Sequence, residues 1–139
     1  MKKLLTTVFL VKARAMMAMS LFTLLALTSA YGQSTSQPVL FKVPFKFSAG
    51  GKTFPSGQYK IDHEPKSEYV TIHDASGATT KLKVITLLAR EASSAPSRIV
   101  FDKVGDAHFL SEVWVPGQEG LLVHSTVGSH GHESVANPS

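Results

Sequence analysis

An alternation of apolar and polar residues near the start of the chain is the feature that most constrains its fold. In the run Val39–Phe47 (VLFKVPFKF), every odd-numbered position is apolar. A period of two places these apolar side chains on one face of an extended strand. Pro44 lacks the N–H group that a central strand needs, so the run predicts an edge strand or an interrupted one, with one face buried.

The rest of the chain continues as short β-type segments separated by glycine and proline turns. After residue 33, no segment has apolar residues spaced by three and four over twelve positions, as a packed helix requires. The segments with strand character are 58–63, 68–73, 79–88, 98–104, 108–115 and 121–127. Their number and spacing predict an all-β domain over residues 39–127, a small antiparallel β-sandwich or barrel of about seven or eight short strands.

The N-terminal segment, residues 1–32, is typical of a secretory signal peptide. Four basic residues precede an apolar run over 15–30, and small residues follow it. Cleavage after Ala30 or after Gly32 fits the small-x-small rule. The run is shorter than the roughly 20 residues needed to span a bilayer. We therefore expect an exported protein, periplasmic or extracellular, whose mature form does not span the membrane and begins with a polar linker at 33–38.

The signal segment also carries the excess positive charge. The whole chain has 14 basic and 10 acidic residues, a formal charge of +4. The excess equals the four basic residues of the signal segment, Lys2, Lys3, Lys12 and Arg14. The remaining chain is neutral and lacks the basic footprint of a nucleic-acid-binding protein, so we expect no nucleic-acid partner. The absence of cysteine excludes disulfides and thiolate metal ligands.

Two motifs give the chain a resemblance. They are FKVPFKFSAGGKTFPSGQY at 41–59 and RIVFDKVGDAHFLSEVW at 98–114. Together they resemble a group of small secreted proteins common in acidobacterial genomes, over residues 39–117. The resemblance implies a compact all-β domain and brings no known activity with it.

Motifs for catalysis are absent from the sequence. Acidic residues flank His63, but there is no Gly-x-Ser-x-Gly elbow and no His-Glu-x-x-His pair. The glycines of the first motif lack the spacing of a phosphate-binding loop and serve turns instead. We therefore expect no enzymatic activity. Trp114 predicts core or rim packing, with a carbohydrate-stacking platform as the alternative.

The histidines provide the sharpest candidate site. Three of the six lie within nine residues, at His124, His130 and His132. A spacing of two puts His130 and His132 on one face of an extended chain, and a turn at 128–129 would bring them back toward His124. Three imidazoles suit Zn, Cu or Ni, and Glu133 can add an oxygen or orient a ring.

A second interpretation of the same residues is simpler. Residues 128–139 are rich in His, Gly and Ser, and this composition predicts a flexible tail. His124 would then end the last strand, while His130 and His132 would lie in a mobile segment that loses chain entropy on binding an ion. A third interpretation is a response to pH, since unperturbed histidines gain charge near pH 6.5.

These observations lead to three functional hypotheses. The favoured one is an exported, non-catalytic β domain that serves as a binding or structural module of the bacterial envelope. The alternative is a periplasmic transition-metal-binding protein that uses His124, His130 and His132. The third is a small carbohydrate-binding or hydrolase-like domain. The sequence identifies no protein or small-molecule partner.

Overall fold

The all-β prediction is confirmed by a computed structural model that describes residues 37–138. Within this range there is no helix, and therefore none long and apolar enough to cross a membrane. The predicted signal peptide, residues 1–32, lies outside the described residues. The strands are β1 (Val39–Val43), β2 (Phe47–Ala49), β3 (Lys52–Phe54), β4 (Gly57–Asp62), β5 (Tyr69–His73), β6 (Thr79–Lys83), β7 (Thr86–Arg90), β8 (Arg98–Val104), β9 (Ala107–Trp114), β10 (Glu119–Leu122) and β11 (Gly131–Ala136).

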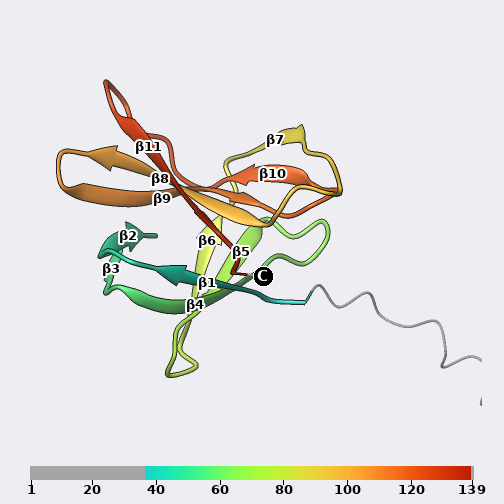
Figure 1. Cartoon of the computed structure of the whole chain (residues 1–139), viewed down its shortest axis with the longest axis horizontal. Helices are drawn as coiled ribbons and strands as arrows, with labels where there is room; N and C mark the ends of the chain where they lie inside the picture. The colour runs from blue at the N-terminus through green and yellow to red at the C-terminus, as the bar shows by residue number, and fades with distance from the viewer. Residues whose placement is uncertain (1–36, 139) are drawn as a thin grey trace, which may run out of the picture. The chain divides into compact units, whose positions relative to one another are not determined.

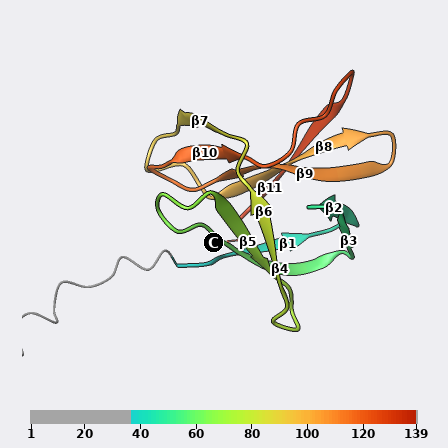
Figure 2. The same ribbon diagram turned by 180° about the vertical axis from the view of Figure 1, so that it is seen from behind.

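The strands form two sheets that lie one above the other (Figures 1 and 2). The first sheet is antiparallel, in the order β1-β4-β5-β6. The second has the order β11-β8-β9-β10-β7, and the short β2–β3 hairpin joins it where β2 pairs in parallel with β9. This arrangement is a small β-sandwich, one of the two architectures that the sequence predicted.

The core lies between the sheets, and in strands such as β1, β4 and β5 alternate residues enter it. Phe41 and Tyr59 face each other across β1 and β4, and both are buried. Phe101 of β8 is fully buried and meets Phe45 and Phe47 edge to face, with ring centroids 4.9 and 5.2 Å apart. Phe47 of β2 also meets Tyr59 of β4 edge to face, with ring centroids 5.2 Å apart, so aromatic rings link the two sheets at this end of the sandwich.

The alternating run at residues 39–47 is interrupted, as its proline predicted. β1 ends at Val43, and the chain resumes as β2 at Phe47 in the other sheet. Pro44 stands at the crossing, where the missing N–H is not needed for a ladder hydrogen bond. β1 is an edge strand of its sheet.

Residues 37–138 form eleven strands, more than the predicted seven or eight, because single predicted segments divide between the sheets. The run 79–88 becomes β6 in one sheet and β7 in the other. The short β2–β3 hairpin adds further elements. Alternation alone does not show where a strand changes sheets, which accounts for the difference.

The prediction of a flexible tail at 128–139 is wrong for residues 131–136. They form β11, which pairs with β8 in an unbroken antiparallel register from Gly131↔Lys103 to Ala136↔Arg98. Val135 packs against the core. A polar edge strand is held mainly by backbone hydrogen bonds to its neighbour, and composition does not reveal this support. The β domain thus extends beyond residue 127 to Ala136.

Candidate functional site

The candidate site lies on the outer face of the second sheet. Successive residues of a strand point to opposite faces, so Phe101 enters the core while Asp102 points outward. Asp102 is nevertheless only 3% exposed, and it is the one buried charged side chain within residues 37–138. Burying a carboxylate costs free energy unless it is hydrogen-bonded or paired with positive charge. The groups around Asp102 therefore show how its charge is compensated.

The chain that follows β10 covers this outer face. β9 has an irregular register opposite Val100 and Phe101 of β8, which leaves Ser111 unpaired in that ladder. The Ser111 carbonyl instead accepts hydrogen bonds from the N–H groups of Val123 and His124, at 2.8 and 3.3 Å. These two hydrogen bonds at the bulge anchor the start of the segment 123–130, which brings Thr126 to Asp102.

One side of the Asp102 carboxylate is occupied by that segment. The backbone N–H of Thr126 donates to Asp102 Oδ2 at 3.2 Å. Burial by itself raises the pKa of Asp102, but the neighbouring side chains of Thr126 and Ser111, the charge of His130 and the Thr126 N–H together lower this pKa below its usual value. The carboxylate is therefore held in its ionised form.

The other oxygen, Asp102 Oδ1, faces two imidazoles. His132 Nδ1 lies 3.2 Å away and His130 Nε2 lies 3.7 Å away. The three ligand atoms all lie within 4.8 Å of one another. In a tetrahedral site with bond lengths near 2.1 Å, neighbouring ligand atoms are about 3.4 Å apart. The two distances to Asp102 lie on either side of this value, so the group can hold a metal ion with small side-chain adjustments.

The hydrogen bonding of His130 indicates a cation at this point. Its Nδ1 lies 2.8 Å from the Gly128 carbonyl, which can only accept, so Nδ1 carries a proton. A neutral His130 then directs the lone pair of Nε2 toward the negative oxygen of Asp102. A lone pair that faces a carboxylate oxygen is unfavourable, and either a proton on Nε2, which makes an ion pair with Asp102, or a metal ion bound by both groups relieves the repulsion. A ligating histidine that donates its other N–H to a backbone carbonyl is the usual support of a metal site.

The three predicted site residues separate in the structure. His130 and His132 come together, with ring centroids 4.9 Å apart. His124 is not in their ligand group. It stacks on Phe109 and lies 3.1 Å from Thr126 Oγ1 through Nε2. His124 therefore supports Asp102 indirectly, through the threonine that hydrogen-bonds this carboxylate.

Asp102 is the member of the group that the sequence interpretation missed. It lies 28 positions before His130 in the chain, and only the pairing of β11 with β8 places it opposite His132. A signal was present: Asp102 ends the apolar run Ile99–Phe101 inside a predicted strand. An acidic residue there is either exposed or paired, and it can be weighed as a ligand.

Glu133, the fourth residue suggested for the site, lies elsewhere. It pairs with Phe101 and therefore projects from the opposite face of the sheet to His132. Its Oε2 lies 2.9 Å from Nε2 of His108, a ring that stacks on Phe45. β11 is thus attached to the sheet at two separate polar contacts, one on each face.

Trp114 is engaged within the fold. Its Nε1 donates to Glu112 Oε2 at 2.7 Å, and the Arg98 guanidinium lies 4.7 Å from the ring centroid. A side chain at Gly120 would come within 2.7 Å of the same ring, so the backbone packs closely there. These contacts make Trp114 a packing residue of the outer face, as the first of the two sequence interpretations predicts.

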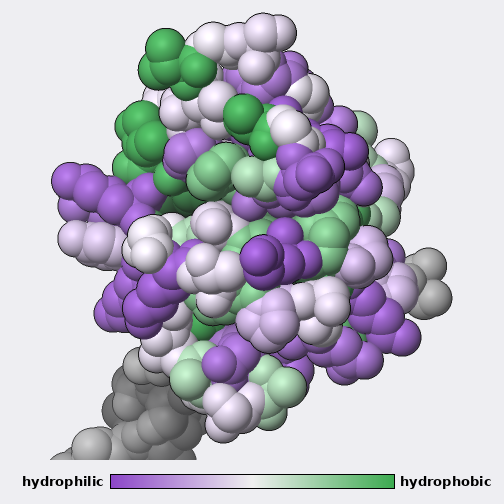
Figure 3. Space-filling model, turned by 90° about the vertical axis from the view of Figure 1, so that its left-hand side faces the viewer, coloured by the Kyte–Doolittle hydropathy of each residue, from purple (hydrophilic) through white to green (hydrophobic). Residues whose placement is uncertain are grey.

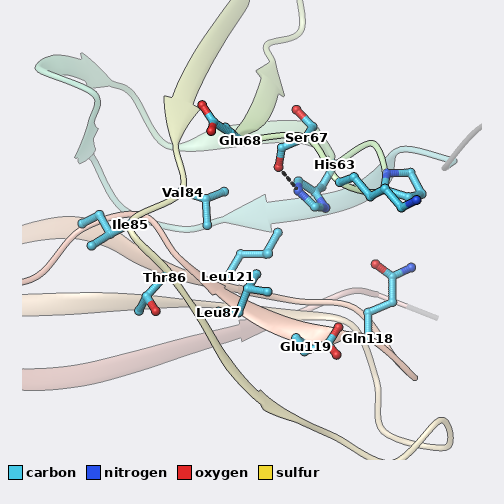
Figure 4. Close-up of a pocket in the computed structure, with 12 residues that line it drawn as sticks. His63, Ser67, Glu68, Val84, Ile85, Thr86, Leu87, Gln118, Glu119 and Leu121 are labelled. Carbon is cyan, nitrogen blue, oxygen red and sulfur yellow. Dashed lines mark hydrogen bonds between the residues drawn. The ribbon is translucent and has the colours of Figure 1, made fainter.

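An open pocket of about 640 Å³ lies at the end of the sandwich near β7 (Figure 4). Val84, Leu87 and Leu121 provide apolar walls. His63 Nε2 bonds to the backbone carbonyl of Ser67 at 2.9 Å, while the Ser67 hydroxyl donates to the Tyr69 carbonyl. Because the imidazole does not contact the hydroxyl, the pair is not arranged as a nucleophile and its base.

The surface adds no second strong candidate on the face seen in Figure 3. Hydrophilic residues predominate there, and apolar residues occur in separate groups. The most exposed large apolar side chain among residues 37–138 is Val127, at 98%. Ile85 and Leu87, 59% and 60% exposed, both line the pocket near β7, whereas Val127 is not among its lining residues.

Comparisons with models of known protein families, with curated proteins and with solved structures found no match.

The lowered pKa of Asp102 predicts an acid-dependent loss of stability in the metal-free protein. A carboxylate whose pKa is depressed by folding stabilises the fold above its unfolded pKa, near 3.9, and this stabilisation is lost as the pH falls through the folded value. Asp102→Asn removes the titrating group. In urea unfolding with a chelator, the variant should be less stable than the wild type at pH 6, and the difference should shrink below about pH 4. Parallel stability curves for the two proteins would contradict the assignment.

Proposed function

We propose that this protein is an exported binding module of the bacterial envelope whose ligand is one transition-metal ion, Zn²⁺, Cu²⁺ or Ni²⁺, held by Asp102, His130 and His132. The observation that carries the proposal is the convergence of one ligand atom each from Asp102, His130 and His132 within 4.8 Å of one another. His130 Nδ1 lies at the Gly128 carbonyl, and its Nε2 lies 3.7 Å from the buried Asp102 carboxylate. Export is supported by the features of residues 1–32, and the resemblance to secreted acidobacterial proteins agrees with it.

The chemistry of the ligand set favours a borderline metal. Two imidazole nitrogens and one carboxylate oxygen suit zinc, copper and nickel better than calcium or magnesium, which prefer oxygen alone. Three protein ligands leave a coordination position for water or for a donor from another molecule. His132 is 57% exposed, so that position is accessible from solvent. An accessible, incompletely ligated ion fits a protein that binds and exchanges metal.

A purely structural module is the second candidate, and one observation favours it. Asp102 and His132 are directly opposed in the register of β8 and β11, so a hydrogen bond from His132 Nδ1 to Asp102 can hold the strands together without metal. In this case His130 also lies beside Asp102 as a protonated imidazole rather than as a metal ligand. The two candidates differ in their requirement for metal, which a titration measures.

The test is calorimetric titration of the purified, chelator-treated protein with Zn²⁺, Cu²⁺ and Ni²⁺ at pH 7. The proposal expects saturable binding of one ion per chain. It also expects affinity to fall as the pH drops below about 6, because protons compete for the imidazoles. Heat that does not saturate would favour the structural module, and saturable binding unaffected by pH would contradict the two imidazole ligands.

A further inference from the structure

We infer that the metal ion controls the docking of β11: the ion binds only when this C-terminal strand is paired with β8, and it thereby holds the strand in place. This inference rests on the proposed function. It extends that function from binding an ion to regulating a conformation. Three features of the β8–β11 pair carry it.

The ligands come from both sides of one strand pair. Asp102 belongs to β8, while His132 belongs to β11 and His130 immediately precedes it. In the register of the pair, His132 is opposite Asp102. If β11 leaves β8, the two imidazoles leave with it and one carboxylate remains. A single carboxylate is a weak ligand set, so the ion discriminates strongly between the docked and the undocked strand.

The Asp102 half of the site keeps its place when β11 moves. β8 is paired along its other edge with β9, and the adjacent Phe101 is fully buried in the core. The Thr126 N–H that bonds Asp102 belongs to the segment anchored at Ser111. Movement of β11 therefore separates the ligands instead of carrying the whole site along.

β11 has little apolar support of its own. It is an edge strand, paired on one side only, and residues along it are exposed or half-buried. Val135 is its apolar contact with the core. Segments with few buried apolar contacts open locally at a lower free energy than the whole fold. An added interaction at such a segment changes its open population strongly.

The inner face of β11 provides a control that does not involve the ion. Glu133 Oε2 lies 2.9 Å from His108 Nε2, on the face of the sheet opposite the metal ligands. Removing this contact should loosen the strand without removing a ligand. The effects of strand attachment and of metal ligation can therefore be separated by two substitutions.

The experiment is amide hydrogen exchange of the purified protein at pH 7, resolved by NMR, in chelator and over a series of free Zn²⁺ concentrations. Calorimetry under the same conditions gives the dissociation constant. A ligand that binds only the docked form lowers the open population by the factor 1 + [Zn²⁺]/Kd. Exchange of the β11 amides that pair with β8 should therefore slow about 100-fold at a zinc concentration 100 times Kd. Amides of β4 and β5 should be unchanged.

Two variants complete the test. Glu133→Ala, which removes the contact with His108, should exchange faster at β11 in chelator and keep the same proportional response to zinc. His132→Asn should lose most of the response. Binding by calorimetry with no change at β11 would overturn the inference and leave the proposed function intact. Equal slowing in every strand would also overturn it, while the absence of zinc binding would refute both proposals.

Discussion

Replacing both His130 and His132 with alanine is expected to weaken zinc binding at least about 100-fold. Each imidazole is a direct ligand in the proposed site, and loss of groups that merely support ligands already costs about 10- to 100-fold in affinity. Asp102 would remain as the single protein ligand. Calorimetry of the chelator-treated variant, with circular dichroism to verify the fold, measures the effect.

His124→Ala is the matched control for this prediction. His124 contacts Thr126 and Phe109 and lies outside the ligand group, so its loss should weaken zinc binding by less than about tenfold. The sequence-based triad of His124, His130 and His132 predicts instead that His124 matters as much as its partners. If His124→Ala weakened zinc binding as much as His130→Ala or His132→Ala does, the sequence-based triad would be supported again. Point substitutions are preferable to truncation at residue 128, which would delete β11 together with the ligands.

Phe101→Ala is expected to reduce the free energy of unfolding by about 3–5 kcal/mol, the usual cost of truncating a fully buried phenylalanine. Phe101 is 0% exposed, and its ring meets those of Phe45 and Phe47, so truncation leaves a cavity where the sheets join. Urea or thermal unfolding measures the loss. Val127→Ala, at a side chain 98% exposed, should change stability by less than about 0.5 kcal/mol.

The outcome of this pair tests the assignment of faces along β8. A loss below about 1 kcal/mol for Phe101→Ala would mean that the core collapses around the missing ring or that the ring is not central. In either case the separation between the core face and the site face, on which the burial of Asp102 depends, would need revision.

The class of fold could be predicted from the sequence because it depends on local pattern. The alternation of Val39–Phe47 sets which side chains enter the core, and Pro44 marks where the strand must break. Both are consequences of backbone geometry within a few residues. The sheet to which each strand belongs depends on pairing between distant segments, and neighbouring residues do not encode it.

The candidate site illustrates the same limit. His130 and His132 are close in sequence, and their spacing alone predicted a shared face. Asp102 joins them through the register of β11 on β8, and His124 is drawn away by its stack on Phe109. Composition made residues 128–139 resemble a tail, because the hydrogen bonds that order a polar edge strand come from the backbone and leave no mark on side-chain type.

The opposed orientations of Phe101 and Asp102 have a consequence for protein engineering. Phe101 lies on the core face of β8 and Asp102 on the opposite face, so the metal ligands can be changed without repacking the core. Replacing Asp102 with histidine or cysteine would offer an ion a softer donor at the same place in the sheet. The scaffold is therefore suited to selecting variants with different metal preferences.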